Sequence, residues 1–175
     1  KTVEDALEVR RRIFSAFEIA ELDPIDAEAE GWLRFVVIGA GPTGVEMAGA
    51  LAELARGTLR HDFRRFDPAR ASILLVEGSP RVLPGFAEDL SRRAEARLRK
   101  MGVEGRTGTR VTAIAGRRLT VRSAEREELL TAGTIVWAAG VRASPLSQKL
   151  AEATGCALDA LGRVMVEADL TVPGY

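Results

Sequence analysis

The most informative segment of the sequence is FVVIGAGPTGVEMAG, residues 35–49. It begins with a continuous apolar run, residues 35–38, which is typical of a short strand buried on both faces of a parallel sheet. The run leads directly into a G-x-G-x-x-G pattern at Gly39, Gly41 and Gly44. Apolar residues then recur at helical spacing, at Val45, Ala48, Leu51, Ala52 and Ala55. A strand, a glycine turn and a helix in this order predict the first half of a βαβ unit.

The glycine turn is suited to a dinucleotide. Gly39 permits the tight turn, Gly41 lets the backbone approach a pyrophosphate, and Gly44 lets the helix pack closely on the strand. The start of the helix adds unpaired N–H groups and the positive end of a dipole. Pro42 and Thr43 are expected within the turn, bordering the nicotinamide half, unless they serve only its geometry. The competing interpretation is a glycine turn that only joins strand to helix.

A second buried-strand pattern, SILLVE at residues 72–77, completes the βαβ unit, whose crossover is expected to be right-handed. Glu77 at its end can accept hydrogen bonds from the adenosine ribose and repel the 2′-phosphate of NADP. Glu77 therefore favours NAD, although it follows the glycines at a greater distance than in the compact motif. Arg81 is a contrary signal, since an arginine just after this strand can attract that phosphate. A solvated acid in a turn is the alternative for Glu77.

The remaining segments predict an α/β protein. Residues 2–20 form an amphipathic helix pattern with a capping box at Thr2 and Asp5. Its expected apolar face consists of Val3, Ala6, Leu7, Phe14 and Phe17. Pro24 is expected to end this helix, and residues 26–30 to form an acidic linker.

Further helices are expected at about residues 87–101 and 145–153, the latter ended by Gly155. Short strands are expected at 103–106, 110–114, 119–122, 134–138 and, weakly, 163–166. The fold class is thus a Rossmann-like parallel sheet with a small antiparallel β-meander. The predicted domains are an N-terminal helix and linker (1–31), a dinucleotide-binding domain (32–144) and a return segment (145–175).

Composition excludes several function classes. Lys plus Arg equals Asp plus Glu, 25 each, so charge gives no indication of a nucleic-acid partner. The apolar runs are far shorter than the roughly 20 residues that span a bilayer. Cys156 is the only cysteine and His61 the only histidine, so we expect no disulfide and no metal site, and a reducing, cytosolic setting. Tyr175 is the only tyrosine and the last residue, which excludes a Tyr-x-x-x-Lys reductase site.

Three segments resemble the type II (alternative) NADH dehydrogenases, single-subunit flavoproteins of the two-dinucleotide-binding-domain superfamily. They are LRFVVIGAGPTGVEMAGALAELA (33–55), TLRHDFRRFDPARASILLVEGSPRVLPGF (58–86) and TIVWAAGVRASPL (134–146). The resemblance implies that NADH passes a hydride to FAD and that electrons continue to quinone. It also implies that Glu46 faces the nicotinamide and flavin, and that the small residues Ala138, Ala139 and Gly140 let the cofactor lie against backbone. A helix-start acid and plain tight packing are the respective alternatives.

The family's flavin-binding glycine motif, Gly-Asp segment and carboxy-terminal membrane helix are not found in these 175 residues. The resemblance therefore implies an NAD-binding domain that binds NADH without turnover and whose residues 145–175 pack on the FAD domain of a longer protein. That protein is expected at the cytoplasmic face of a membrane, and a homodimer is compatible with the sequence.

The chain offers no convincing proton acceptor for direct alcohol oxidation, whereas hydride transfer to a flavin depends mainly on position. Alternatives remain: the NAD domain of a ferredoxin- or disulfide-reductase relative, a glycine motif that binds FAD instead, and a non-catalytic NAD(H) sensor. The Arg-rich connection at residues 56–70 is expected to be a solvated helix end and loop, with anionic lipid as the alternative partner.

Overall fold

The structure is a computed structural model that describes residues 2–25, 31–140 and 142–175. The acidic linker expected at residues 26–30 lies outside this range. The chain divides into two compact units, Lys1–Ala139 and Gly140–Tyr175. The two units are described separately below.

The first unit is built on a four-stranded sheet with the order β3-β2-β1-β7. Its strands are β1 (Arg34–Ile38), β2 (Ser72–Val76), β3 (Val103–Arg106) and β7 (Thr134–Trp137). All neighbouring pairs are parallel, and Val36 of β1 pairs with Leu74 on one side and Ile135 on the other. The predicted α/β class is confirmed, and burial on both faces explains the unbroken apolar runs of β1 and β2.

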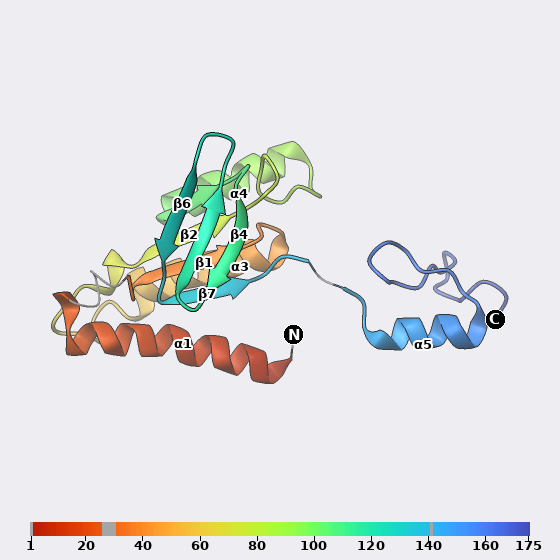
Figure 1. The fold of residues 1–175 in the computed structure, drawn as a ribbon, viewed down its shortest axis with the longest axis horizontal. Helices are drawn as coiled ribbons and strands as arrows, with labels where there is room; N and C mark the ends of the chain where they lie inside the picture. The colour runs from red at the N-terminus through yellow and green to blue at the C-terminus, as the bar shows by residue number, and fades with distance from the viewer. Residues whose placement is uncertain (1, 26–30, 141) are drawn as a thin grey trace. The chain divides into compact units, whose positions relative to one another are not determined.

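Different layers cover the two faces of this sheet (Figure 1). Phe35 and Leu75 belong to the core cluster that includes residues of the three helices α1 (Val3–Leu22), α3 (Pro42–Glu53) and α4 (Glu88–Lys100). Val36 and Leu74 belong to a second cluster with residues of the antiparallel sheet β4-β5-β6. The strands of that sheet are β4 (Arg110–Ala115), β5 (Arg118–Arg122) and β6 (Glu127–Thr131). The expected β-meander is therefore present.

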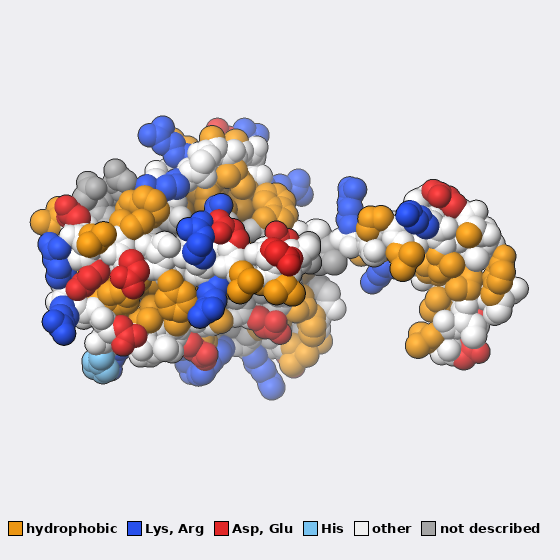
Figure 2. All heavy atoms as spheres, turned by 90° about the horizontal axis from the view of Figure 1, so that it is seen from below, with side chains coloured by type: hydrophobic (Ala, Val, Ile, Leu, Met, Phe, Trp, Pro, Cys, Tyr) orange, Lys and Arg blue, Asp and Glu red, His pale blue; other side chains and the backbone are white. Residues whose placement is uncertain are grey.

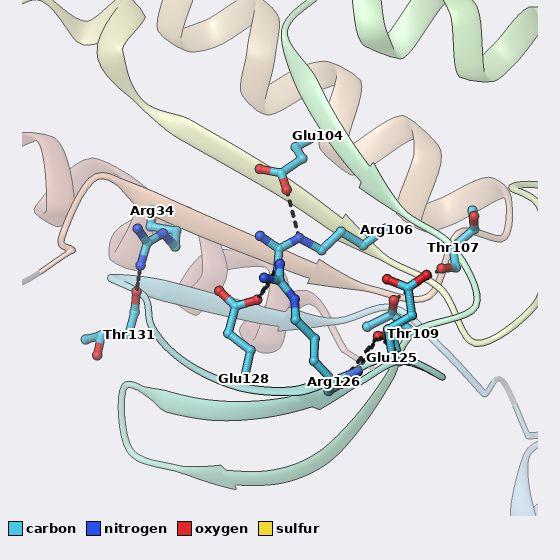
Figure 3. A network of polar contacts seen from close by, with 10 residues as sticks. Arg34, Glu104, Arg106, Thr107, Thr109, Glu125, Arg126, Glu128 and Thr131 are labelled. Carbon is cyan, nitrogen blue, oxygen red and sulfur yellow. Dashed lines mark hydrogen bonds and ion pairs between the residues drawn. The ribbon is translucent and has the colours of Figure 1, made fainter.

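Strand β6 was missing from the sequence prediction. Its sequence EELLT carries two adjacent acids, and only Leu130 is buried, because β6 is an edge strand with one face in solvent. Polar contacts hold it to the parallel sheet (Figure 3). The Arg106 guanidinium bridges Glu104 and Glu128 at 2.7 and 2.9 Å, and Arg34 donates to the Thr131 carbonyl oxygen at 2.8 Å.

Helix α1 begins as predicted. The Thr2 hydroxyl accepts from the Asp5 N–H, and the Asp5 carboxylate accepts from the Thr2 N–H. The predicted apolar face is wrong at the first two turns, where Val3 and Leu7 are 72% and 56% exposed. The reason is that this end of α1 borders a groove instead of covering the sheet. The buried residues of the helix are Ile13, Ala16, Phe17 and Ala20.

The Arg-rich connection between α3 and β2 begins as a π-helix, η1 (Leu54–Thr58), and ends in a 3-10 turn, η2 (Pro68–Arg70). Between them, Phe63 and Phe66 stack around Phe17, which also stacks on Phe35 at 5.4 Å between ring centroids. The Glu21 carboxylate accepts the backbone N–H groups of residues 64 and 65. The connection thus fastens the second half of α1 to the sheet.

The second unit contains the helix α5 (Pro145–Thr154), which Ser144 caps. As the sequence predicted, Gly155 ends this helix, with a φ of +74°. The strand expected at 163–166 is wrong, since only an isolated bridge joins Leu158 to Val164. No described residue of this unit is buried. Among the described helices, none combines the length and the apolar composition of a membrane-spanning segment.

Candidate dinucleotide-binding site

The glycine turn lies at the carboxyl end of β1, which has a parallel neighbouring strand on each side. From β1 the sheet extends to β2 and β3 on one side and to β7 on the other. This is a topological switch point, where open α/β sheets form a crevice for ligands. Backbone hydrogen bonds fix its walls, because Gly39 donates to the Val76 carbonyl oxygen and Ala138 to that of Ile38, each at 2.8 Å.

Packing within the protein requires two of the three glycines. A Cβ on Gly44 would lie 1.8 Å from the Gly39 carbonyl oxygen, and one on Gly39 would lie 2.7 Å from the Ala139 Cβ. Gly39 also has a φ of +98°, which favours glycine. The predicted site residues Gly39, Gly44, Ala138 and Ala139 are therefore neighbours, and their small size serves close packing of β1, α3 and the end of β7.

Gly41 differs from the other two. A Cβ built on it would have no protein atom within 4 Å, and its φ of −70° suits any residue. The protein's own atoms therefore do not require glycine at this position. The open space beside Gly41 is where a ligand would approach the backbone.

Helix α3 starts earlier than expected, at Pro42, so Pro42 and Thr43 belong to its first turn. Proline is favourable at this first position because its φ is preset and no N–H is left unpaired. No side chain caps this end of α3. By helix geometry the N–H groups of Thr43 and Gly44 have no acceptor within the helix, so they are available to an anion.

Glu77 follows β2 and points its carboxylate at the glycine turn. One oxygen accepts from the Ala40 N–H and the other from the Ser79 N–H, both at 2.7 Å. Burial acts to raise the pKa of Glu77, but the hydrogen bonds from Ala40 and Ser79 prevail and hold this pKa below its ordinary value. The carboxylate is therefore anionic at neutral pH, and its oxygens retain lone pairs for further donors.

Arg81, the contrary signal in the sequence, is engaged elsewhere. Its guanidinium donates to the carbonyl oxygens of Phe86 and Pro84, each at 2.9 Å. These contacts close the loop that it belongs to. Two of its nitrogens thus donate to backbone carbonyl oxygens, so fewer of its N–H groups are left to donate to a phosphate.

An apolar groove of about 410 Å³ continues from the turn. Its lining comes from the start of α1, from α3 and from β7, and includes Thr43, Met47, Trp137 and Ala138. Figure 2 looks onto the α1 side, where apolar side chains form patches between charged ones.

The structure places two other predicted site residues away from this groove's lining or in the second unit. Glu46 is exposed on α3 but does not line this groove. Gly140 belongs to the second unit and has a φ of +65°.

Sequence reasoning missed one component of the site. The Leu83 N–H donates to the Ala40 carbonyl oxygen at 2.7 Å, so the loop after β2 contacts the glycine turn directly. The sequence indicates a loop there through Pro80, Pro84 and Gly85, but it does not indicate this contact. His61 is exposed and does not line this groove. Cys156 is half-buried within the second unit. Within residues 2–25, 31–140 and 142–175, no cluster of metal-ligating side chains could hold an ion.

Comparison with known proteins gives consistent matches. The family model described as pyridine nucleotide-disulphide oxidoreductase matches residues 5–174. Two type II NADH:quinone oxidoreductases of Mycobacterium tuberculosis, NdhA and Ndh, are each 46% identical over the whole chain. The chain spans 38% of the length of either relative. The structure of NDH2 from Plasmodium falciparum in complex with NADH has a TM-score of 0.77 at 22% identity, covering 95% of this chain and 34% of that one, which shows the shared fold.

Proposed function

Because the chain belongs to the pyridine nucleotide-disulphide oxidoreductase family, we propose that it holds the NAD(H)-binding domain of a flavin-dependent NADH dehydrogenase. The observation that carries this proposal is the open space beside Gly41 at the uncapped start of α3. A pyrophosphate has the size and charge for that position. The names of the relatives, both NADH:quinone oxidoreductases, support NADH as the substrate and quinone as the final acceptor.

Different residues would bind different parts of the dinucleotide. The pyrophosphate lies against Gly41 and accepts from the N–H groups of Thr43 and Gly44, where the helix dipole favours negative charge. Gly39 and Gly44 shape the turn, and Pro42 presets its exit into the helix. Glu77 accepts from the adenosine ribose hydroxyls with the lone pairs that the backbone leaves unused.

The nicotinamide half would lie along the apolar groove beside Thr43 and Ala138. Ala138 and Ala139 would let a flat ring approach the backbone, and the family resemblance implies the same for Gly140. Glu46, which is exposed on α3 outside this groove, is the candidate from the resemblance alone for the residue that faces nicotinamide and flavin. The apolar lining of the groove fits an aromatic ring system. FAD, held by other parts of the longer protein, supplies the hydride acceptor, while the residues here bind and orient NADH and exclude water.

We further propose that the site prefers NADH to NADPH. An anionic Glu77 repels a 2′-phosphate, and Arg81 has two nitrogens committed to backbone carbonyl oxygens. The partners of this chain would be NADH, the FAD domain of the same protein and, through that flavin, a quinone at the cytoplasmic face of a membrane. A homodimer is compatible with this arrangement.

Two other functions deserve a test. One is the NAD domain of a ferredoxin- or disulfide-reductase relative, which the shared family supports. The other is an NAD(H)-sensing module without catalysis. Turnover of NADH with a quinone by the longer protein, and not with disulfides or ferredoxin, would favour the NADH dehydrogenase over both.

The purified chain itself should bind NADH without oxidising it. The measurement follows NADH fluorescence with a soluble quinone present and no flavin added. We expect a saturable change on binding and a constant NADH concentration afterwards, because the hydride acceptor is missing. Oxidation at an enzymatic rate under these conditions would show that the chain carries its own acceptor and would refute the proposed division of roles.

A further inference from the structure

The loop after β2 contains a leucine in an unfavourable backbone conformation. Leu83 has a φ of +47°, and the other non-glycine residue with a positive φ in the described part of the chain is Leu170, at +69°. Non-glycine residues rarely adopt this region, and such conformations persist only where the surroundings enforce them. The neighbouring Val82 is 1% exposed and belongs to the main core cluster, so this loop is packed firmly against the protein.

Hydrogen bonds close the loop around Leu83. The buried Ser91 hydroxyl donates to the Val82 carbonyl oxygen at 2.6 Å. The Phe86 N–H donates to the Leu83 carbonyl oxygen at 2.9 Å. The Arg81 guanidinium holds the far side through the Pro84 and Phe86 carbonyl oxygens. These contacts fix the backbone on both sides of Leu83 and enforce its positive φ.

The consequence is a hydrogen bond to the centre of the glycine turn. Ala40, which is fully buried between Gly39 and Gly41, receives the Leu83 N–H on its carbonyl oxygen and gives its own N–H to Glu77. Both backbone polar groups of Ala40 are thus hydrogen-bonded to residues that follow β2. Because Gly41 follows directly, the position of its open space depends on these two contacts.

We propose that Leu83 is a positioning residue for the dinucleotide. Its backbone N–H, held at a positive φ by the closed loop, fixes the glycine turn in the shape that receives the pyrophosphate. This inference rests on the proposed NAD(H)-binding function. It assigns no contact between the Leu83 side chain and the ligand, so the backbone conformation and not the side chain is what binding requires.

The test compares Leu83→Gly with Leu83→Val in calorimetric titrations of the chain with NADH. Glycine adopts a positive φ freely, so Leu83→Gly should bind within about twofold of the wild-type chain. A β-branched residue is a genuine outlier there, so Leu83→Val should bind at least about tenfold more weakly. Leu170→Val is the matched control, since it introduces the same strain in the second unit and should leave affinity unchanged. Circular dichroism establishes that each variant is folded at the titration temperature.

The outcomes separate the possible roles. A folded Leu83→Val that binds as tightly as wild type overturns the inference, and so does a Leu83→Gly as weak as Leu83→Val. A merely structural role would lower the melting temperature without changing the affinity of the folded protein. If Leu83→Val does not fold, Ser91→Ala loosens the loop instead and should weaken NADH at least about threefold; an unchanged affinity would overturn the inference. Failure of the wild-type chain to bind NADH would instead refute the proposed function.

Discussion

Gly41 and Gly44 belong to one motif but are required for different reasons. Gly44 is needed by the fold, since a Cβ there would collide with the Gly39 carbonyl oxygen. Gly41 has open space around it, so the fold itself does not require glycine there, and the proposed pyrophosphate site is what would use this space. The spacing of the glycines predicted a packing role for Gly44, which the surrounding atoms explain, and a ligand-facing role for Gly41, which stays a prediction.

This difference predicts that Gly41→Ala separates binding from folding. The variant should keep a melting temperature close to that of the wild-type chain, because its Cβ meets no protein atom. Its NADH affinity should fall by about tenfold or more, because the Cβ occupies the approach of the pyrophosphate. Gly57→Ala is the matched control, since its Cβ also meets nothing within 4 Å, and Gly57 lies in the π-helix after α3. Equal affinities for all three proteins would place the ligand elsewhere.

Glu77 should make part of the stability depend on pH. Despite burial, the hydrogen bonds from Ala40 and Ser79 lower its pKa in the folded protein. Because the pKa of Glu77 is lower in the folded protein, its carboxylate stabilises the fold at pH values above its unfolded-state pKa of about 4.5. This stabilisation is lost as the pH falls through the folded-state pKa. The difference in unfolding free energy between wild type and Glu77→Gln, measured in urea, should be full at neutral pH and shrink below about pH 4.5. A difference that stays constant into strong acid would contradict this role.

Among single residues, the sequence indicated which small residues lie together but not which polar contacts surround them. Gly39, Gly44, Ala138 and Ala139 are brought together, as expected of a strand–turn–helix unit beside a neighbouring strand. The conformation of Leu83 had no sequence signal, because only the closed loop around it enforces a positive φ. The second role of Glu77, as an acceptor for the turn itself, was also hidden, since spacing does not reveal which backbone N–H groups a carboxylate reaches.

At the scale of elements, buried strands and capped helices were predicted well. The capping box of α1, the glycine that ends α5 and the apolar runs of β1 and β2 are local signals, and the structure follows them. The edge strand β6 and the groove under the first turns of α1 depend on neighbours that are distant in sequence. The spacing of apolar residues along the sequence therefore did not predict β6, and it predicted too much burial for the first turns of α1.

The docking of α1 should depend on a single aromatic side chain. Phe17 is 1% exposed and stacks with Phe35, Phe63 and Phe66, which join α1 and the Arg-rich connection to the sheet. Phe17→Ala should lower the free energy of unfolding by about 3–5 kcal/mol in urea denaturation. Leu7→Ala, on the exposed part of the same helix, should change it by no more than about 0.5 kcal/mol. Similar losses for both variants would mean that this aromatic cluster does not hold α1.

At the scale of the whole molecule, both hydrophobic clusters belong to the first unit. The described residues of the second unit expose large apolar side chains, among them Leu146, Leu170 and Tyr175. None of the described residues of this unit is buried, so these apolar side chains have no core of described residues to pack into. The sequence predicted a return segment there, and its placement on an FAD domain stays a prediction.

We propose that this chain binds NAD(H) at the glycine turn and selects it over NADP(H) through Glu77. The most direct test is a calorimetric titration of the purified, flavin-free chain with NADH and, separately, with NADPH. We predict saturable binding of one NADH per chain and an affinity for NADPH at least about tenfold lower, since Glu77 repels the 2′-phosphate. Binding of NADPH as tight as that of NADH, or of neither nucleotide, would contradict the claim.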